Sequence, residues 1–190
     1  MILAAGSSSR LGRPKQLLEF DGMTLLSHSV IEAANSNASI VVVIIGKNPD
    51  LIVKEIDNDI VHIVENKDWE EGMASSVRLG LKTMRDIDTE LEAVIFMVCD
   101  QPYISSSVLN ELMIKYQQTG KPIVTSNYGE ATGPPALFHK SLFSELMELK
   151  GDVGARKIIQ QHAHQAETVL FPQGEIDIDT KEDYEALKTL

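Results

Sequence analysis

The chain has few cysteines and aromatic residues and no long apolar run. It contains one cysteine, Cys99, and one tryptophan in 190 residues. A lone cysteine cannot form an intramolecular disulfide, and no stretch reaches the roughly 20 apolar residues that a membrane-spanning helix needs. The first ten residues lack the basic segment ahead of an apolar stretch that marks a secretory signal. We therefore expect a cytoplasmic protein with no membrane partner.

Positive charge is also scarce. The sequence holds 17 Lys and Arg residues against 28 Asp and Glu residues, a formal net charge of −11. Such a surface repels phosphate backbones, which argues against a nucleic-acid partner. The beginning of the chain is the exception, because Arg10, Arg13 and Lys15 all precede the first acidic residue, Glu19. A basic loop on an acidic chain predicts a site for one small polyanion.

The pattern of apolar residues predicts an α/β fold. Short apolar runs rich in β-branched residues predict buried strands at residues 2–5, 40–45, 60–64, 93–99 and 123–125. Helical periodicity lies between and after them, at residues 24–36, 51–57, 75–85 and 108–118. Residues 177–190 begin strand-like and end as a helix from about Lys181. With no linker or repeat, this predicts one Rossmann-like domain, a mostly parallel twisted sheet with helices on both faces.

The loop after the first strand has the chemistry of a phosphate site. Its sequence over residues 3–15 is LAAGSSSRLGRPK. Gly6 and Gly12 permit close backbone approach, the three serines offer hydroxyl and N–H groups, and Arg10 and Lys15 add positive charge. It is neither a Walker A loop nor a G-x-G-x-x-G loop. The alternative is a flexible basic surface loop.

This loop resembles the signature of the MobA-like nucleotidyltransferases, L-A-A-G-x-S-x-R-x-G-x-x-K. Within them it is most similar to the molybdenum cofactor cytidylyltransferases, including the purine-catabolism proteins that serve xanthine dehydrogenase. The resemblance runs from Ile2 to about Tyr184. It implies a fold of the nucleotide-diphospho-sugar transferase type, with residues 1–100 binding nucleotide and residues 101–190 binding the acceptor.

The resemblance also implies roles for residues of the loop. Arg10 and Lys15 would contact the triphosphate and stabilise the departing pyrophosphate, so both are expected to be catalytic. The other nucleotide contacts expected here are Leu3, Ala4, Ala5, Gly6, Ser7 and Ser9. Relatives usually carry several residues before the first strand, so a short first strand and an internal start both stay open.

Asp100 ends the most apolar predicted strand. Ligands of open α/β sheets bind at the carboxyl ends of the strands, and a carboxylate is a suitable ligand for Mg²⁺. The stretch C-D-Q-P stands here as in the cytidylyltransferases, so we predict that Asp100 is a catalytic metal ligand. The alternative is an aspartate that only forms the turn. Cys99 is expected to fill the core, since no neighbour would lower its pKa.

A second carboxylate is expected in the stretch D-I-D-T at residues 177–180. Strand-like alternation would point Asp177 and Asp179 in the same direction. In the family this element closes the active site, and we favour Asp177 over Asp179 as the second Mg²⁺ ligand. The alternative is that Asp179 or Thr180 caps the helix that follows.

Residues 66–76 resemble the base- and ribose-recognition segment of the family. Gly72 would allow close approach of the nucleobase, and the amide and hydroxyl groups nearby can hydrogen-bond it. The nucleotide contacts expected here are Asn66, Gly72, Met73, Ser75 and Ser76. The alternative is a loop pinned by Trp69, with the serines capping the next helix.

Two later stretches, at residues 133–138 and 151–156, match further elements of the family. The second opens a helix, and a helix N-terminus beside an arginine is a plausible phosphate seat. The acceptor contacts implied are Gly133, Pro135, Asp152 and Arg156. Asp152 as a simple helix cap stays open.

These parts predict Mg²⁺-dependent nucleotidyl transfer. The phosphate of the acceptor would attack the α-phosphorus in line, with positioning and electrostatics carrying the rate. The favoured substrates are CTP and a molybdopterin-type acceptor, and the product would mature xanthine dehydrogenase-type enzymes through transient contact with a molybdenum hydroxylase or its chaperone. Three alternatives stay open: GTP as the nucleotide, a sugar- or alcohol-phosphate acceptor, and a non-catalytic nucleotide-binding chaperone.

Overall fold

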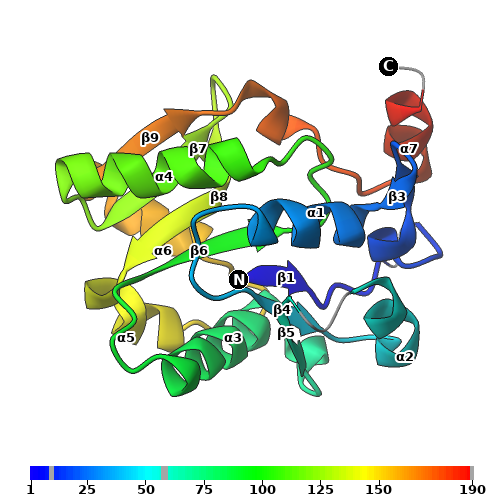
Figure 1. Ribbon diagram of the computed structural model, residues 1–190, viewed down its shortest axis with the longest axis horizontal. Coiled ribbons are helices and arrows are strands. Elements are labelled where there is room, and N and C mark those ends of the chain that lie inside the picture. The colour runs from blue at the N-terminus through cyan, green and yellow to red at the C-terminus, as the bar shows by residue number, and fades with distance from the viewer. Residues whose placement is uncertain (9–10, 57–59, 189–190) are drawn as a thin grey trace.

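A computed structural model describes residues 1–8, 11–56 and 60–188. A seven-stranded sheet crosses the molecule in the order β5-β4-β1-β6-β8-β7-β9 (Figure 1). Neighbouring strands run parallel except for β8, which is antiparallel to β6 and to β7. The strands are β1 (Ile2–Ala4), β4 (Val42–Ile45), β5 (His62–Glu65), β6 (Ala93–Val98), β7 (Ile123–Asn127), β8 (Thr132–His139) and β9 (Ala166–Leu170).

Helices cover both faces of this sheet. In Figure 1, α1 and α4 lie on one side of it, while α3, α5 and α6 lie on the other. The predicted fold class, a mostly parallel sheet between helices, is confirmed. The helices are α1 (Leu25–Ala34), α2 (Pro49–Ile52), α3 (Met73–Ile87), α4 (Ser106–Thr119), α5 (Phe143–Met147), α6 (Arg156–Gln161) and α7 (Lys181–Leu187). Short 3₁₀ turns span Lys15–Leu17, Val53–Glu55, Trp69–Glu71, Lys140–Leu142, Ala163–Gln165 and Pro172–Glu175. No helix in the described ranges is both long and apolar enough to cross a membrane.

Strand β8 was not predicted, because it contains two adjacent prolines. Proline removes a ladder donor and is normally kept out of central strands. Here the pairing with β7 shifts register between Thr125 and Ser126. The hydroxyls of these two residues donate to the carbonyls of Gly133 and Pro135, both at 2.8 Å. Side-chain hydrogen bonds therefore satisfy carbonyls at the irregular part of the strand pair.

The C-terminal tail, from residue 177 onward, differs in part from its predicted structure. The helix from Lys181 is present as α7, and Thr180 caps it by accepting from the N–H of Asp183 at 3.1 Å. Residues 177–180 belong to no strand, so the strand-like beginning was wrong. Instead, the N–H of Ile178 donates to the carbonyl of Asp100 at 3.1 Å. This bond brings the tail to the carboxyl end of β6.

The core and the strand pairing explain why the site lies at the carboxyl ends of the parallel strands. Alternate residues of β4 face opposite sides: Val42 and Ile44 pack in the cluster that contains α3, and Val43 and Ile45 in the cluster that contains α1. Such two-sided burial is typical of parallel strands. Strands β1 and β6 are parallel neighbours, with Leu3 paired to Val98. Their carboxyl ends therefore deliver the glycine–serine loop and Asp100 to the same place.

Candidate nucleotidyl-transfer site

Two cavities open side by side at the carboxyl ends of β1 and β6. The first has a volume of about 300 Å³ and the second of about 640 Å³. Five residues line both cavities: Leu3, Lys15, Met73, Val98 and Asp100. Molecules bound in the two cavities would therefore meet beside one lysine and one aspartate.

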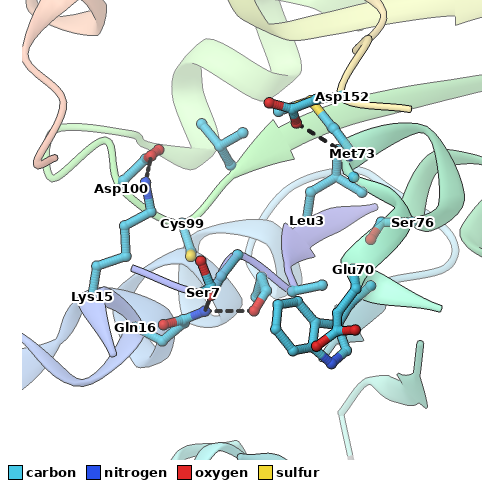
Figure 2. Close-up of a pocket in the computed structure, with 16 residues that line it drawn as sticks. Leu3, Ser7, Lys15, Gln16, Glu70, Met73, Ser76, Cys99, Asp100 and Asp152 are labelled. Atoms are coloured by element: carbon cyan, nitrogen blue, oxygen red, sulfur yellow. Dashed lines mark hydrogen bonds and ion pairs between the residues drawn. The ribbon is translucent and has the colours of Figure 1, made fainter. Parts of the chain in front are cut away.

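The first cavity is built around the loop after β1. Six of the nucleotide contacts predicted in this loop line the cavity (Figure 2), namely Leu3, Ala4, Ala5, Gly6, Ser7 and Lys15. The other two residues predicted in this loop, Ser9 and Arg10, lie outside the described residues. The catalytic role of Arg10 therefore stays a prediction.

Lys15 and Gln16 fix the shape of this loop. The backbone N–H of Lys15 donates to the hydroxyl of Ser8 at 2.9 Å. The side-chain amide of Gln16 donates to the carbonyls of Ala4 at 2.6 Å and Gly6 at 3.2 Å (Figure 2). The sequence analysis did not single out Gln16, since a polar residue in a loop carries no periodic signal. These hydrogen bonds show that the buried side-chain amide of Gln16 fixes the conformation of the loop.

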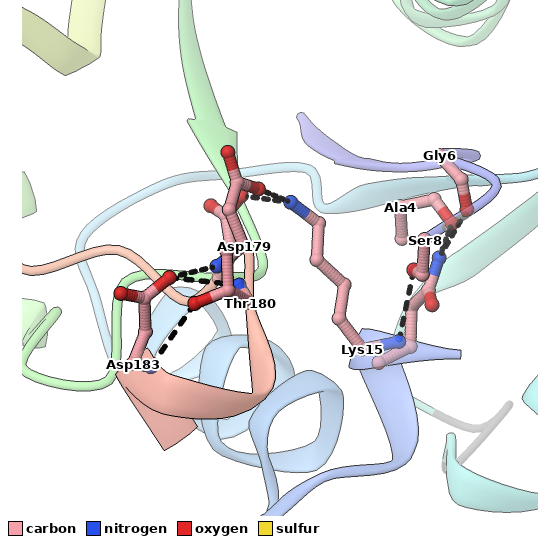
Figure 3. A network of polar contacts seen from close by, with 9 residues as sticks. Ala4, Gly6, Ser8, Lys15, Asp179, Thr180 and Asp183 are labelled. Atoms are coloured by element: carbon pink, nitrogen blue, oxygen red, sulfur yellow. Dashed lines mark hydrogen bonds and ion pairs between the residues drawn. The ribbon is translucent and has the colours of Figure 1, made fainter. Parts of the chain in front are cut away.

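Lys15 lies between two carboxylates at the boundary of the cavities. Its ammonium group donates to Asp100 and, at 3.0 Å, to Asp179 (Figures 2 and 3). Burial alone would lower the pKa of Lys15, but the charge of Asp100 and the hydrogen bonds to both aspartates raise it above its usual value. Lys15 therefore carries a fixed positive charge at neutral pH. The cap of α7 is Thr180 rather than Asp179, which leaves the carboxylate of Asp179 directed at Lys15.

The carboxylates here suit a hard cation. One oxygen of Asp100, Oδ1, is buried and has no hydrogen-bond partner in the described ranges. The pKa of Asp177 is raised, first by partial burial and then by the charges of Asp100 and Asp179. Within the described part of the chain no group of three or more His, Cys, Asp or Glu side chains could hold a metal. Mg²⁺ often uses only one or two protein carboxylates, with waters and phosphates as its other ligands, so the donor set fits it.

Cys99 lies beside these charges but is a core residue, as predicted. Its side chain is buried. Burial first, and then the charge of Asp100, raise the pKa of its thiol to about 12. The thiol is therefore protonated at neutral pH and is not a nucleophile.

The segment predicted to recognise the nucleoside is only partly at the cavity wall. Gly72, Met73 and Ser76 line the first cavity. Asn66 and Ser75 do not line it, because they are buried behind it. The amide of Asn66 donates to the hydroxyls of Ser75 at 2.8 Å and Ser76 at 2.9 Å. The segment's polar groups thus mainly stabilise its own conformation, while two unpredicted residues, Trp69 and Glu70, line the cavity.

Gly72 is required by packing between two loops. Its φ of 112° is unfavourable for other residues. A Cβ there would lie 2.6 Å from the backbone of Gly151 and 2.7 Å from that of Asp152. The N–H of Ala74 donates to the carbonyl of Gly151 at 3.1 Å, which holds the two loops together. The glycine is thus explained without a nucleobase against it.

The predicted acceptor residues divide between the cavities. Gly133 and Arg156 line the second cavity. Pro135 does not line it, although its neighbour Pro134 does. Asp152 lines the first cavity, and its carboxylate accepts from the N–H of Met73, at the beginning of α3, over a long 3.5 Å. Asp152 therefore lies on the side of the predicted nucleotide residues and does not cap α6.

The second cavity is lined by both apolar and charged or polar side chains. Phe96, Ala136, Phe138 and Ile159 are among its lining residues. Tyr128, which the sequence analysis missed, also lines it and donates its hydroxyl to the carbonyl of Pro134. Burial, more than any other factor, raises the pKa of Tyr128 to about 12, so the phenol stays protonated. Such a cavity suits a largely apolar or heterocyclic body with a few polar groups.

The family follows from a comparison with known domains. The model of the MobA-like NTP transferase domain matches residues 1–166. The chain belongs to this family. It is a nucleotidyltransferase of the MobA-like type, and the resemblance expected from the sequence is confirmed.

Several curated proteins are similar to this MobA-like chain. It is 28% identical to the purine catabolism protein PucB of Bacillus subtilis, over 99% of this chain and 94% of that protein. It is 28% identical to the nicotine blue oxidoreductase of Paenarthrobacter nicotinovorans, over 85% and 80%. It is 20% identical to the molybdenum cofactor cytidylyltransferase of Escherichia coli, over 97% and 92%. The shared family therefore includes proteins with different names and activities.

Solved structures share the fold of this MobA-like chain. Rv0371c of Mycobacterium tuberculosis H37Rv is 27% identical and superimposes with a TM-score of 0.86, covering 100% of this chain and 95% of that one. A structure of Rv0371c in complex with manganese has a TM-score of 0.80 at 25% identity, covering 98% and 95%. A structural neighbour of this chain thus binds manganese.

Proposed function

We propose that this chain transfers the cytidylyl group of CTP to the phosphate of a molybdopterin-type acceptor and releases pyrophosphate. The observation that carries the proposal is the junction of two cavities at Lys15 and Asp100. Transfer between two bound molecules requires that their reacting phosphates meet beside fixed charges. A site for one ligand alone would need only one of these cavities.

The first cavity is assigned to the nucleotide. The glycine–serine loop offers backbone and hydroxyl groups to phosphates, and Lys15 adds a charge that Asp100 and Asp179 hold in place. In the proposed reaction a phosphate oxygen of the acceptor forms a bond to the α-phosphorus. The bond from that phosphorus to the bridging oxygen of the β-phosphate breaks, and its electron pair leaves with pyrophosphate. Lys15, and Arg10 by family resemblance, offset the charge that develops on this leaving group.

Asp100 and Asp177 are the residues that would hold Mg²⁺. The ion would supply neutralisation of the phosphate charges. Two observations support this assignment: a buried oxygen of Asp100 has no hydrogen-bond partner among the described residues, and partial burial and neighbouring negative charges raise the pKa of Asp177. Asp177 and Asp179 both line the second cavity, so either carboxylate is within the site.

The second cavity is assigned to the acceptor. Its aromatic and aliphatic residues offer an apolar surface against which a heterocycle could pack. Arg156 lies in its wall and could bind a phosphate. The division into a nucleotide-binding part at residues 1–100 and an acceptor-binding part at residues 101–190 belongs to this proposal. The division is not strict, since Asp152 lines the nucleotide cavity and Phe96 lines the acceptor cavity.

The choice of CTP and of molybdopterin rests on three stretches that occur together in the cytidylyltransferases: C-D-Q-P, G-D-V-G-A-R and D-I-D-T. The cytidylyltransferase of Escherichia coli is among the relatives, and PucB is named for purine catabolism. The same proposal includes a role in maturing xanthine dehydrogenase-type enzymes in the cytoplasm. This role would involve transient contact with the hydroxylase or its chaperone.

The test is kcat/KM for CTP and for GTP with the same molybdopterin acceptor. Buried polar groups matched to the cytosine edge would be left unpaired by guanine, a mismatch that can discriminate by about 10⁴-fold. We expect a clear CTP preference. Equal values or a GTP preference would move the chain to a guanylyltransferase function. Turnover of nicotine blue without pyrophosphate release would instead favour the activity in the name of the oxidoreductase relative.

A further inference from the structure

Two buried glutamines stand next to the charged residues at the junction. Gln16 follows Lys15 in the sequence, and Gln101 follows Asp100. They are only 2% and 4% exposed. A buried amide is costly unless its N–H groups are hydrogen-bonded, so the partners of these amides indicate what each one holds in place.

Gln16 is bonded to the wall of the first cavity. Its amide donates to the carbonyls of Ala4 and Gly6, at 2.6 and 3.2 Å. Both of these residues line the first cavity, as Gln16 does, and none of the three lines the second. Figure 2 shows Gln16 below Ser7, with its amide directed into the turn of the loop. Gln16 thus fixes the turn on which the phosphates of a nucleotide would lie.

Gln101 is bonded to the wall of the second cavity. Its amide donates to the carbonyl of Gly174 at 2.6 Å, the hydroxyl of Tyr128 at 3.0 Å and the carbonyl of Pro134 at 3.1 Å. These partners come from three separate segments: the end of β7, the strand β8 and the 3₁₀ turn that precedes Asp177. All three partners line the second cavity, and neither they nor Gln101 line the first.

We propose that Gln16 and Gln101 are positioning residues with separate tasks. Gln16 fixes the position of the wall of the first cavity, the proposed nucleotide site, relative to Lys15. Gln101 fixes the position of the acceptor wall relative to Asp100. This inference rests on the proposed function for the identity of the two ligands. It adds that affinity for each ligand depends on a different buried amide.

The experiment compares Gln16→Met with Gln101→Met. Methionine has nearly the length and volume of glutamine but no N–H donor. The dissociation constant of CTP with Mg²⁺ is measured by calorimetry without acceptor, and the KM of the molybdopterin acceptor is measured at saturating CTP. We expect Gln16→Met to weaken CTP binding about tenfold and to leave the acceptor KM within about twofold. Gln101→Met should raise the acceptor KM about tenfold and leave CTP binding unchanged.

A failure of the inference differs from a failure of the proposed function. If the wild-type protein binds no nucleoside triphosphate, the proposed function fails and this inference fails with it. If the wild-type protein binds CTP and each variant changes both constants to the same extent, or neither constant, the inference alone is overturned.

A milder variant covers the case in which Gln101→Met does not fold. Tyr128→Phe removes one of the three partners of Gln101 and leaves its bonds to Gly174 and Pro134 in place. We expect an acceptor KM about threefold higher with unchanged CTP affinity. A loss of CTP affinity as large as the rise in the acceptor KM would overturn the inference that the two amides have separate tasks.

Discussion

The two cavities are built in different ways from one sheet. The first is formed by the loop after β1 and by the beginning of α3, and much of its wall is backbone and small side chains. The second is bounded by β8, the antiparallel strand, and by the tail around Asp177, with aromatic rings in its interior. The wall of the first cavity thus comes mainly from a loop of small residues, whereas β8 adds aromatic and aliphatic side chains to the second.

The two cavities share the junction at Lys15 and Asp100. Lys15 comes from the nucleotide loop, Asp100 from the central strand, and Asp179 from the tail, so three distant segments meet in one ion cluster. This arrangement lets the two cavities differ in chemistry while sharing the groups that act on the reacting phosphate.

The largest effect is expected at Asp100, one of the residues that line both cavities. Asp100→Asn keeps the shape of the side chain but removes the charge that a metal ion needs. Pyrophosphate release should fall by about 10³-fold, since the electrostatic contribution at the reacting phosphate is lost. The thermal midpoint should stay within a few degrees of wild type. Pyrophosphate release near the wild-type rate would remove Asp100 from the metal site.

Lys15→Ala tests the other half of the junction. Losing one preorganised positive charge should lower kcat by about 10²-fold, or ~3 kcal/mol, with a smaller change in the KM for CTP. In the absence of nucleotide, titration with Mn²⁺ should show tighter metal binding, because a competing cation has been removed from Asp100 and Asp179. Lys54→Ala, at an exposed site that lines neither cavity, is the control. An unchanged kcat with only a raised KM would mean that Lys15 binds substrate and transition state equally.

Gly72→Ala tests the wall of the nucleotide cavity. The new Cβ would meet the backbone of residues 151 and 152, and the φ of 112° is strained for alanine. We expect the free energy of unfolding to fall by about 2–4 kcal/mol, measured by urea denaturation. Gly6→Ala is the matched control on the same wall, since nothing lies within 4 Å of its added Cβ. Similar stability losses in the two variants would contradict the packing role of Gly72.

The smallest effect distinguishes the two tail aspartates. Asp177→Asn should lower pyrophosphate release about tenfold more than Asp179→Asn. The physical reason is that Asp179 already pairs with Lys15, whereas the raised pKa of Asp177 reflects burial and neighbouring negative charges that a bound cation would relieve. Metal-dependence curves for the two variants give the comparison. A larger loss in Asp179→Asn would assign the second metal contact to that residue.

The difference between the cavities also explains which features the sequence could predict. The parallel strands have local apolar runs, and the position of Asp100 at the end of β6 follows from strand pattern alone. Strand β8 carries Pro134 and Pro135, which argue against a central strand, and β9 is largely exposed on one face. Their assignment depends on partners distant in the sequence, which no local pattern reveals.

The same reason applies to the side chains of the site. The motifs identified the residues with charge, such as Lys15 and Asp177, because charge has a recognisable chemistry in any loop. They did not identify Gln16, Gln101 or Tyr128, whose importance comes only from the carbonyls they meet after folding. Asn66 shows the converse, since its amide is polar in sequence but is used inside its own segment.

The central claim is that the two cavities hold two substrates of one transfer. The most direct test incubates the protein with CTP and Mg²⁺, with and without the molybdopterin acceptor, and measures pyrophosphate and cytidylylated acceptor together. The account predicts both products in equal amounts, and neither when the acceptor is left out. Pyrophosphate formed at the same rate without acceptor would indicate hydrolysis, and nucleotide binding with no pyrophosphate under either condition would indicate a carrier; each result would contradict the claim.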